Sequence, residues 1–540
     1  MKGMMMHRPL KIADLITFAA ETYPTGEIVS VRTEGDIHRT TYRETSRRIA
    51  QLAHGLKELG IRPGDRVATL AWNGYRHFEL YYAISGIGAI CHTINPRLSA
   101  EQMIYIVNHA DDRVLFVDVT FLPIVEKLRP HLPKDLRVVV MTDQTHMPET
   151  SLDGVQCYED ILDGKPEEIE WPDFPEEQAA GLCYTSGTTG NPKGTLFSQR
   201  STVLHAYSLC VTIPKTLCEG TRILPFVPLF HVNAWGLPYA APLSGASLIF
   251  PGGALDGKSL FGLMDREKVF SAWGVPTVWF ALMKEITENG RLPDGLKDIV
   301  VGGSAAPQSL IEAFEEKGIN VCHAWGMTEM SPLGTQCNLP EHLEDLSFEE
   351  RIARKRSQGR RVFGVDMKIV DEKGARLPHD GKTPGHLYVR GNTVTSGYFE
   401  DPEASKSVFD DEGWFFTGDI AAIDQDGFLI ITDRSKDLIK SGGEWISSLD
   451  LENIVMSHPD VANCAVIAVS DPKWDERPLL IVQAGADEKP ASQDLLDLLA
   501  EKFAKWQLPD NVVFVDALPL TATGKVSKLT LRKQLAEDAE

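Results

Sequence analysis

The sequence lacks the cysteine patterns of disulfide scaffolds and metal sites. Its eight cysteines include no CxxC pair and no metal-ligand cluster. Such a set is typical of free thiols in a reducing compartment, so we expect a cytoplasmic protein without disulfides. The first 24 residues contain no long apolar run, because Asp14 interrupts the one apolar stretch, and no secretory signal is predicted.

An excess of basic charge is also missing. There are 54 Lys and Arg residues against 76 Asp and Glu, a net charge of −22. Such a surface would repel a nucleic-acid backbone, which excludes a general nucleic-acid partner. Residues 223–255 carry no formal charge, a length that could span a membrane, but five prolines and four glycines interrupt them. We therefore expect a buried core of short strands and turns there, and no integral membrane segment.

Apolar residues, in contrast, are plentiful and regularly spaced. The chain has 540 residues, of which 43% are apolar, enough for more than one core. Helical spacing alternates with short apolar runs, which favours parallel strands joined by helical crossovers and hence an α/β fold. The expected strands are 67–71, 89–93, 114–117, 138–141, 299–301 and 428–432, and the expected helices include 49–59, 76–88 and 309–317.

A loop rich in glycine and hydroxyl residues follows one apolar run. Residues 184–194 read YTSGTTGNPKG. Glycines let consecutive N–H groups approach an anion, and hydroxyls and Lys193 can join them, so the loop predicts a phosphate site. Pro192 stands where a Walker A loop has its second glycine, so that motif is excluded. Taken alone, the stretch could equally be a flexible linker.

Six further strings occur in order along the chain. They are VPLFHVNAW at 227–235, GGSAA at 302–306, HAWGMTE at 323–329, TGD at 417–419, DRSKDLIKSGGEW at 433–445 and PLTATGK at 519–525. With the loop they resemble the adenylate-forming superfamily of AMP-binding enzymes, which includes acyl-CoA ligases, peptide-synthetase adenylation domains and luciferases. The resemblance runs through nearly the whole chain. SGGEWIS and VPLFHVNAW look most like bacterial fatty-acyl-CoA ligases, and among them the ligases of 3-(methylmercapto)propionate.

The resemblance implies two domains. A large N-terminal domain of stacked sheets with helices is expected over residues 1–432, and a small mobile α+β lid over residues 433–540, with Asp433 as the hinge. Only fifteen residues follow Lys525, too few for a carrier domain, so free CoA is the expected acceptor. The family includes monomers and dimers, so a homodimer is allowed.

The resemblance also assigns a nucleotide site. The expected ATP or AMP contacts are Thr185, Ser186, Gly187, Thr188, Thr189, Gly190, Lys193, Gly303, Ser304, Ala305, Ala324, Trp325, Gly326, Met327, Thr328, Asp419, Arg434, Lys436, Lys440 and Trp445. A carboxylate such as Asp419 suits two vicinal ribose hydroxyls, although a Gly-Asp pair alone is only a turn signal. The alternative for Lys436 and Lys440 is a solvated helix face.

The same resemblance assigns Mg²⁺, acid and CoA contacts. Thr185 and Glu329 would hold Mg²⁺, a hard cation that prefers oxygen ligands. The catalytic residues would be Lys525, His231 and Glu329; an ammonium such as that of Lys525 stabilises charge developing at the α-phosphorus. The acyl contacts would be His231, Val232, Trp235, Gly302, Gly303 and Trp325, and the CoA contacts Lys440, Ser441, Gly442, Gly443 and Glu444.

Ordinary structural explanations exist for each of these residues taken singly. Gly302 and Gly303 could form a tight turn, His231 and Trp235 could be core residues, and Lys525 could be an inert surface lysine. Many relatives have tyrosine in place of Trp325, and we expect the larger ring to shorten the acyl end of the pocket.

The sequence therefore predicts an ATP-dependent acid:CoA ligase that forms an acyl-adenylate and then a thioester. An apolar acid of short to medium length is expected, with 3-(methylmercapto)propionate as one candidate and a medium- or long-chain fatty acid as the alternative. Two rivals stay open: a light-emitting adenylate enzyme, and a regulator that binds ATP without turnover.

Overall fold

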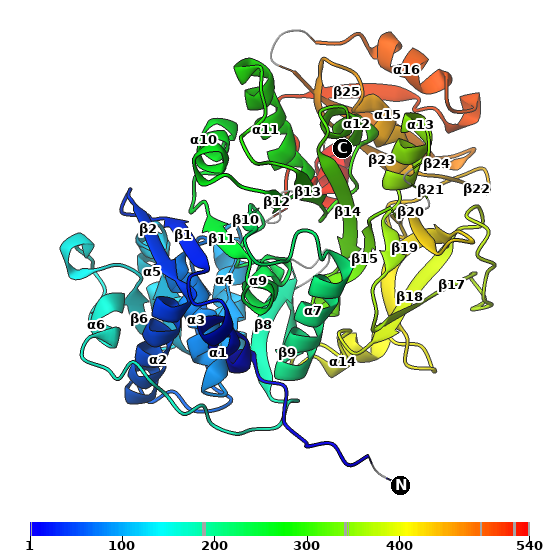
Figure 1. Cartoon of the computed structure of the whole chain (residues 1–540). Helices are drawn as coiled ribbons and strands as arrows, with labels where there is room; N and C mark the ends of the chain where they lie inside the picture. The colour runs from blue at the N-terminus through cyan, green and yellow to red at the C-terminus, as the bar shows by residue number, and fades with distance from the viewer. Residues whose placement is uncertain are drawn as a thin grey trace.

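Three sheets organise the described part of the chain (Figure 1). The computed structural model describes residues 1, 3–185, 191–339, 343, 345–485, 489–521 and 525–537. One sheet has thirteen strands in the order β17-β18-β19-β20-β16-β15-β14-β13-β12-β10-β11-β1-β2, and a second has seven in the order β7-β6-β5-β3-β4-β8-β9. The third, of five strands, has the order β22-β21-β24-β23, with β25 also paired to β24. The predicted α/β class is confirmed.

The strands are β1 Glu27–Val31, β2 Ile37–Thr41, β3 Arg66–Leu70, β4 Ile90–Thr93, β5 Asp112–Val117, β6 Arg137–Val140, β7 Gln156–Cys157, β8 Ala179–Thr185, β9 Lys193–Ser198, β10 Arg222–Pro225, β11 Ser247–Phe250, β12 Ser271–Gly274, β13 Asp298–Val301, β14 Asn320–Gly326, β15 Leu333–Cys337, β16 Gly359–Arg361, β17 Val365–Val370, β18 Gly385–Gly391, β19 Phe415–Ile423, β20 Phe428–Arg434, β21 Ile439–Ser441, β22 Glu444–Ile446, β23 Val461–Asp471, β24 Asp475–Ala484 and β25 Asn511–Val515. The α-helices are α1 Ile12–Thr22, α2 Tyr42–Glu58, α3 Tyr75–Gly86, α4 Ala100–Ala110, α5 Leu122–Leu128, α6 Tyr158–Leu162, α7 Gln199–Thr212, α8 Val232–Trp235, α9 Leu237–Ser244, α10 Gly257–Glu267, α11 Pro276–Asn289, α12 Gln308–Glu315, α13 Phe348–Lys355, α14 Pro402–Ser407, α15 Ser448–Val455, α16 Ser492–Ala500 and α17 Lys528–Glu537.

The seven-stranded sheet has the expected βαβ rhythm. Strands β3 to β8 pair in parallel, and β9 returns antiparallel to β8. The helix predicted at 76–88 is α3, all of whose residues are buried, and the strands predicted around it are β3, β4, β5 and β6 to within two residues. Apolar runs without alternation mark strands that are covered on both faces, which is why these could be predicted.

The uncharged segment 223–255 is buried as predicted, but it contains helices. It forms β10, α8, α9 and β11, whereas short strands and turns alone were expected. Pro238 lies in the first turn of α9, where a missing N–H costs nothing, so proline there begins a helix instead of breaking one. In the described part of the chain, no helix is long and apolar enough to cross a membrane.

The largest core lies between the two big sheets. It contains residues of both sheets, such as Val67 and Leu248, together with residues of helices α1, α2, α3, α7 and α9. Helices α10, α11 and α12 cover the other face of the parallel strands β10 to β13. The carboxyl ends of β13 and β14 therefore meet at one edge of a fixed sheet, where α/β proteins bind ligands.

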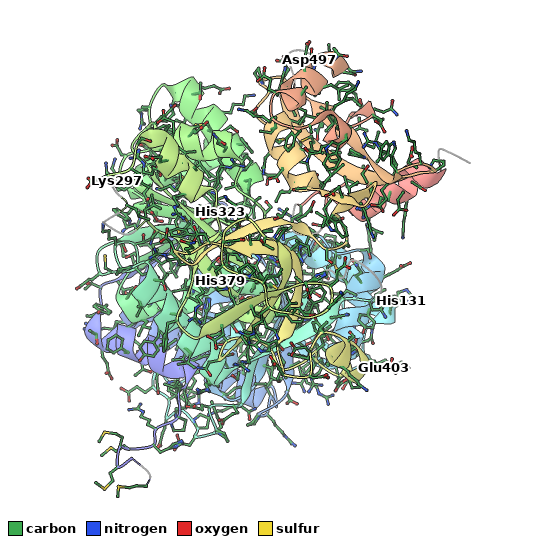
Figure 2. The ribbon with its side chains drawn as sticks, turned by 90° about the vertical axis from the view of Figure 1, so that its right-hand side faces the viewer. His131, Lys297, His323, His379, Glu403 and Asp497 are labelled. Atoms are coloured by element: carbon green, nitrogen blue, oxygen red, sulfur yellow. The ribbon has the colours of Figure 1, made fainter. Side chains whose placement is uncertain are left out.

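The five-stranded sheet and helices α15, α16 and α17 form a separate body at the C-terminal end, coloured orange to red in Figure 1. Figure 2 shows it at the upper right, with Asp497 at its top. It has its own apolar core, which includes Ile439, Leu451 and Leu480. β20 ends in the large sheet at Arg434 and β21 begins the small sheet at Ile439.

Candidate functional site

The glycine-rich loop joins two paired strands. β8 ends at Thr185, β9 begins at Lys193, and these two residues are partners in the register. The Thr185 hydroxyl donates to the Lys193 carbonyl at 3.4 Å. The half-buried Lys193 has its Nζ 5.0 Å from the centroid of the Tyr398 ring. The predicted phosphate contacts Ser186, Gly187, Thr188, Thr189 and Gly190 lie outside the described residues.

Glu329 is a buried carboxylate, not the exposed surface group that a lone glutamate would suggest. Its side chain accepts a hydrogen bond from the Tyr398 hydroxyl at 2.9 Å, and the residue is only 7% exposed. Burial raises the pKa of Glu329, while the Tyr398 hydrogen bond and the charges of Arg434 and Lys193 oppose that rise. Thr328, beside it, is also buried.

Asp419 is held from two sides. Its Oδ1 pairs with Arg434 Nε at 2.9 Å, and its Oδ2 accepts a hydrogen bond from Trp325 Nε1 at 3.0 Å. The residue is 2% exposed, and burial raises its pKa despite the opposing charge of Arg434. Asp419 and Arg434 are register partners on β19 and β20, so the sheet itself brings them together.

The glycines after β13 lie against the ring of Trp235. A Cβ on Gly302 would lie 3.0 Å from Trp235 Cη2 and 3.1 Å from the Ala324 carbonyl oxygen. Gly303 has φ +79°, and a Cβ there would lie 3.7 Å from the same indole. The structure thus brings together three of the predicted acyl contacts. Ser304 is exposed and Ala305 half-buried at the same turn, while Gly326 ends β14 and Met327 follows it.

The VPLFHVNAW string adopts an unusual backbone. Val232, Asn233, Ala234 and Trp235 all have φ between +44° and +56°, and Gly236 continues with +82°. Consecutive left-handed residues that are not glycine are disfavoured by Cβ contacts and persist only where surrounding packing fixes them. This turn aims Trp235 at Gly302 and Gly303. His231 precedes it, and desolvation lowers the pKa of His231 to about 4, with the Lys525 charge acting in the same direction.

Lys525 belongs to the C-terminal body but acts on residues of the large sheets. Its surroundings lower its pKa to about 8, first through desolvation and then through the charges of Arg434 and Lys436, against Asp419 and Glu329. The side chain keeps an exposed surface. The predicted catalytic lysine is therefore within electrostatic range of Asp419, Glu329 and His231, which come from three different strings.

Asp433, the predicted hinge, lies at the junction of the two bodies. It belongs to β20 of the large sheet, yet its Oδ2 accepts hydrogen bonds from the N–H and the hydroxyl of Ser448, both at 2.7 Å. Ser448 begins α15 of the small body, and its Oγ accepts a hydrogen bond from Lys528 Nζ at 2.6 Å. Burial raises the pKa of Asp433, and the Lys528 charge opposes that rise.

The predicted CoA loop is a hairpin of the small body. Gly442 and Gly443, with φ +61° and +89°, form its turn between β21 and β22. Gly442 N–H donates to the Trp474 carbonyl at 2.7 Å, and Lys440 Nζ lies 5.6 Å from the Trp445 ring. These contacts are all within the small body, and Glu444 and Trp445 are exposed. The contacts described do not join Lys440 or Trp445 to the residues around Lys525.

Sequence analysis did not identify Tyr398, Ser448 or Lys528 as site residues. Tyr398 contacts both Glu329 and Lys193, and Ser448 and Lys528 contact each other next to Asp433. Each contacts a residue distant in the chain, so local patterns do not report these contacts. The only signal available was the TSGYF string at 395–399, where an aromatic pair follows a turn-forming glycine.

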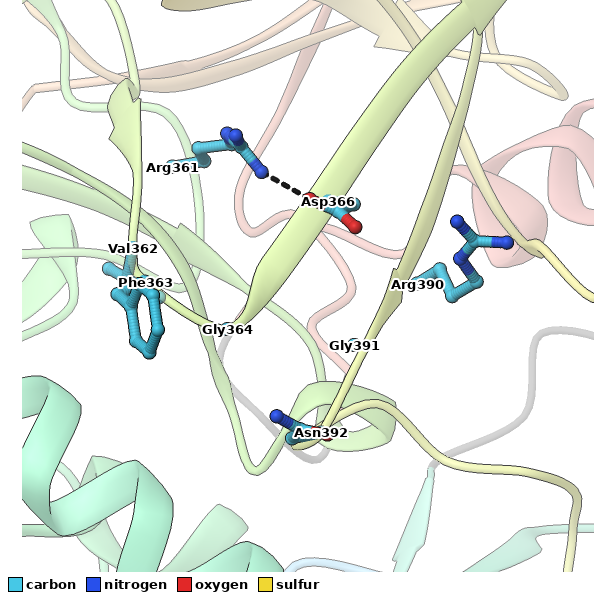
Figure 3. A pocket seen from close by; sticks show the side chains of 8 residues that line it. All are labelled: Arg361, Val362, Phe363, Gly364, Asp366, Arg390, Gly391 and Asn392. Atoms are coloured by element: carbon cyan, nitrogen blue, oxygen red, sulfur yellow. Dashed lines mark hydrogen bonds and ion pairs between the residues drawn. The ribbon is translucent and has the colours of Figure 1, made fainter. Parts of the chain in front are cut away.

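A hollow of about 790 Å³ lies elsewhere on the large sheet (Figure 3). Its lining residues are Arg361, Val362, Phe363, Gly364, Asp366, Arg390, Gly391 and Asn392. The ion pair between Arg361 and Asp366 crosses it, and Arg390 lies over the Trp414 ring at 4.4 Å. Its lining includes none of the predicted site residues among those described.

Comparison with known proteins gives a consistent assignment. The model of the AMP-binding enzyme family matches residues 17–399, and that of the AMP-binding enzyme C-terminal domain matches residues 450–525. The chain is 48% identical to the 3-methylmercaptopropionyl-CoA ligase of Ruegeria lacuscaerulensis over 99% of both chains. It is 47% identical to the medium-chain-fatty-acid--CoA ligase of Ectopseudomonas oleovorans over 99% of this chain and 98% of that one.

A solved structure agrees with the sequence comparison. The anthranilate CoA ligase AuaEII in complex with anthranoyl-AMP superposes with a TM-score of 0.86 and 27% identity, over 98% of this chain and 99% of that one. The fold, the family models and the relatives together make this chain a member of the AMP-binding enzymes, in their acyl-CoA ligase branch.

Proposed function

We propose that this protein joins a short or medium apolar acid to CoA through an acyl-adenylate, with residues of both bodies acting on the first step. The observation that carries the proposal is the electrostatic interaction of Lys525, from the C-terminal body, with Asp419, Glu329 and His231 of the large sheets. A regulator that only binds ATP has no need of a cation that a second domain holds within electrostatic range of these residues.

The first step is attack of the acid's carboxylate oxygen on the α-phosphorus of ATP, with pyrophosphate as the leaving group. Negative charge builds on the α-phosphoryl oxygens, and the Lys525 ammonium stabilises it in the protonated state. His231 stays neutral because of its low pKa, so it can donate a hydrogen bond to the acid without competing as a cation. Asp419 retains lone pairs for the ribose hydroxyls, since two hydrogen bonds leave part of its capacity free.

The residues present fit a magnesium ion held mainly by the nucleotide. Glu329 is a buried carboxylate with one neutral hydrogen-bond donor, and burial alone disfavours its charge, so a nearby cation would stabilise it. Within the described residues there is no cluster of three or more His, Cys, Asp or Glu that could hold a metal, which suits an ion that takes most ligands from phosphate and water. When bound, Mg²⁺ neutralises phosphate oxygens; Glu329 and Thr185 would hold it.

The second step is attack of the CoA thiolate on the acyl carbonyl carbon, which releases AMP and forms the thioester. The Lys440 to Glu444 hairpin is proposed to deliver CoA, and its two glycines leave a narrow passage for pantetheine. Because Lys525 and this hairpin belong to one body, a rotation about Asp433 would exchange them at the site. In that view the lid residues run from 433 to 540, and the geometry described here belongs to the adenylate-forming position.

The packing of Trp235 supports a short acid. Its indole lies against Gly302 and Gly303, where a longer acyl chain would need room. We therefore propose 3-(methylmercapto)propionate as the first acid to test. A medium-chain fatty acid is the second, since a ligase of such acids is almost as similar to this chain as the ligase of the sulphur acid.

The test is mass spectrometry of products formed with MgATP, CoA and acids from acetate to palmitate, including 3-(methylmercapto)propionate. One acid should yield AMP and its CoA thioester far faster than the rest. Pyrophosphate release without a thioester would point to another acceptor, and no release with any acid would favour the regulator.

A further inference from the structure

One segment of the first domain connects the β8–β9 hairpin, which holds the glycine-rich loop, to the HAWGMTE motif that contains Glu329. It runs from Thr393 to Phe399, between β18 and α14. The Thr395 N–H donates to the Glu329 carbonyl at 2.7 Å, and the Phe399 N–H donates to the Gly194 carbonyl at 2.8 Å. The backbone around Tyr398 is thus fixed at one end to the carboxylate string and at the other to β9.

The Tyr398 side chain repeats this connection. Its hydroxyl donates to Glu329 Oε1 at 2.9 Å, and its ring face lies 5.0 Å from Lys193 Nζ. A hydrogen bond to a carboxylate is stronger than one between neutral groups, and a cation over a ring face is attracted to it. The half-buried Tyr398 therefore contacts the buried Glu329 carboxylate through its hydroxyl and the Lys193 ammonium through its ring face.

The tyrosine also keeps the two charges apart. Lys193 rests on the ring while its charge acts on Glu329 from a distance. Without the ring, a flexible lysine could fold onto the carboxylate, and the pair would neutralise itself. With the ring in position, the ammonium remains available to phosphate oxygens and the carboxylate to a cation.

We propose that Tyr398 is a positioning residue that sets Glu329 and Lys193 at the separation needed by a metal–triphosphate group. The inference rests on the proposed adenylation function and deepens it, since it assigns the two parts of Tyr398 to two parts of the ligand. The hydroxyl acts through Glu329 on the divalent cation. The ring acts through Lys193 on the phosphates, with or without the cation.

Two substitutions separate these parts. Tyr398→Phe removes the hydroxyl and keeps the ring, whereas Tyr398→Leu removes both. The measurements are ATP affinity by calorimetry, once with EDTA and once with Mg²⁺, and the Mg²⁺ concentration for half-maximal ATP–pyrophosphate exchange. Tyr398→Phe should raise that Mg²⁺ concentration about tenfold, the loss of one hydrogen bond to a charged group, with unchanged ATP affinity in EDTA. Tyr398→Leu should also lower the affinity for ATP in EDTA about two- to fivefold.

A double-mutant cycle shows whether the hydroxyl acts through Glu329. In a Glu329→Gln background, Tyr398→Phe should change the Mg²⁺ requirement little further, because the partner is already lost. Fully additive effects would overturn the proposal, and so would a folded Tyr398→Phe protein with an unchanged Mg²⁺ requirement.

Tyr388 provides the matched control. It carries Lys368 over its ring at 5.5 Å, the same type of contact, but it belongs to β18 and contacts neither Glu329 nor Lys193 in the interactions described. Tyr388→Phe and Tyr388→Leu should leave ATP affinity and the Mg²⁺ requirement unchanged. Calorimetry needs no turnover, so the role of Tyr398 can be judged even if no acid is converted and the proposed function fails.

Discussion

Trp325 Nε1 donates a hydrogen bond to Asp419 Oδ2 at 3.0 Å, across 94 positions of the chain. The opposite oxygen of Asp419 pairs with Arg434, so the carboxylate is fixed in orientation before any ligand arrives. An indole N–H is a donor only and cannot reverse this role. Trp325 was expected to shape the acyl pocket, and that stays a prediction; its contact with Asp419 connects it to the ribose end as well.

Trp325→Phe should therefore weaken use of the nucleotide. The substitution keeps an aromatic six-membered ring but removes the indole N–H donor. A hydrogen bond to a charged group contributes about 1.5–3 kcal/mol, so the KM for ATP should rise about tenfold or more. The check is the ratio of kcat/KM for ATP to kcat/KM for 2′-deoxyATP, which lacks one of the ribose hydroxyls proposed to bind Asp419. This ratio should be smaller in the variant than in the native protein. Trp279→Phe, which removes an indole hydrogen bond to the Gly274 carbonyl, should leave that ratio unchanged.

Lys525→Ala should separate the two half-reactions. Loss of the ammonium should lower the rate of adenylation, measured by ATP–pyrophosphate exchange, about 10²- to 10³-fold. This is the range seen when one electrostatic stabiliser is removed. Thioester formation from supplied acyl-adenylate should stay close to that of the native protein, since a different lid position carries it out. Equal loss of both half-reactions would contradict the two-position lid.

The low pKa of Lys525 predicts a pH dependence with a definite sign. Its value of about 8 means that the ammonium is present below pH 8 and lost as the pH rises through 8. The kcat/KM of adenylation reports the free enzyme, so it should fall above about pH 8. Lys525→Arg, which keeps its charge, should remove this fall whatever its absolute rate. A fall at the same pH in that variant would assign it to another group.

The elements that sequence could predict are those with local patterns. β3, β4, β5 and α3 were found because apolar periodicity reports burial directly. The left-handed turn at 232–236 could not be found, because its backbone is fixed by packing around Trp235 and disfavoured by its own residues.

The candidate site likewise contains residues that sequence motifs could predict and residues that only the tertiary structure reveals. The order of motif strings led to Lys525, Asp419 and Glu329, which the structure brings together. Tyr398 could not be predicted because its contact with Glu329 spans 69 positions. No sequence pattern near either residue indicates that the two side chains are in contact. The role of Asp433 was assigned from the family, but its bonds to Ser448 come from tertiary structure alone.

Lys528 should be essential to the stability of the small body. Its Nζ lies 2.7 Å from Glu452 Oε1, and both side chains are largely buried. Lys528→Met would leave the Glu452 charge without its partner, at a cost of about 3–5 kcal/mol in free energy of unfolding. Chemical denaturation monitored on the small body checks this. Lys528→Met with Glu452→Leu should recover only part of the loss, because Lys528 also donates to Ser448 and Glu452 also accepts from the Val466 N–H. Lys502→Met, at an exposed lysine, should change the free energy of unfolding by less than about 0.5 kcal/mol.

Gly302→Ala tests whether Trp235 and the glycine turn border the acid. The new methyl would meet Trp235 Cη2 at 3.0 Å and the Ala324 carbonyl oxygen at 3.1 Å, both closer than ordinary contacts. The carbonyl belongs to β14 and cannot move easily, so the indole must shift into the space proposed for the acyl chain. Overpacking of this kind costs about 1–3 kcal/mol. Because the shifted indole takes this cost from acid binding, the KM for the acid should rise about five- to 150-fold while the KM for ATP changes little. Gly262→Ala, where a Cβ meets nothing within 4 Å, is the control and should change neither constant. A rise in the KM for ATP alone would mean that the turn borders the nucleotide and not the acid.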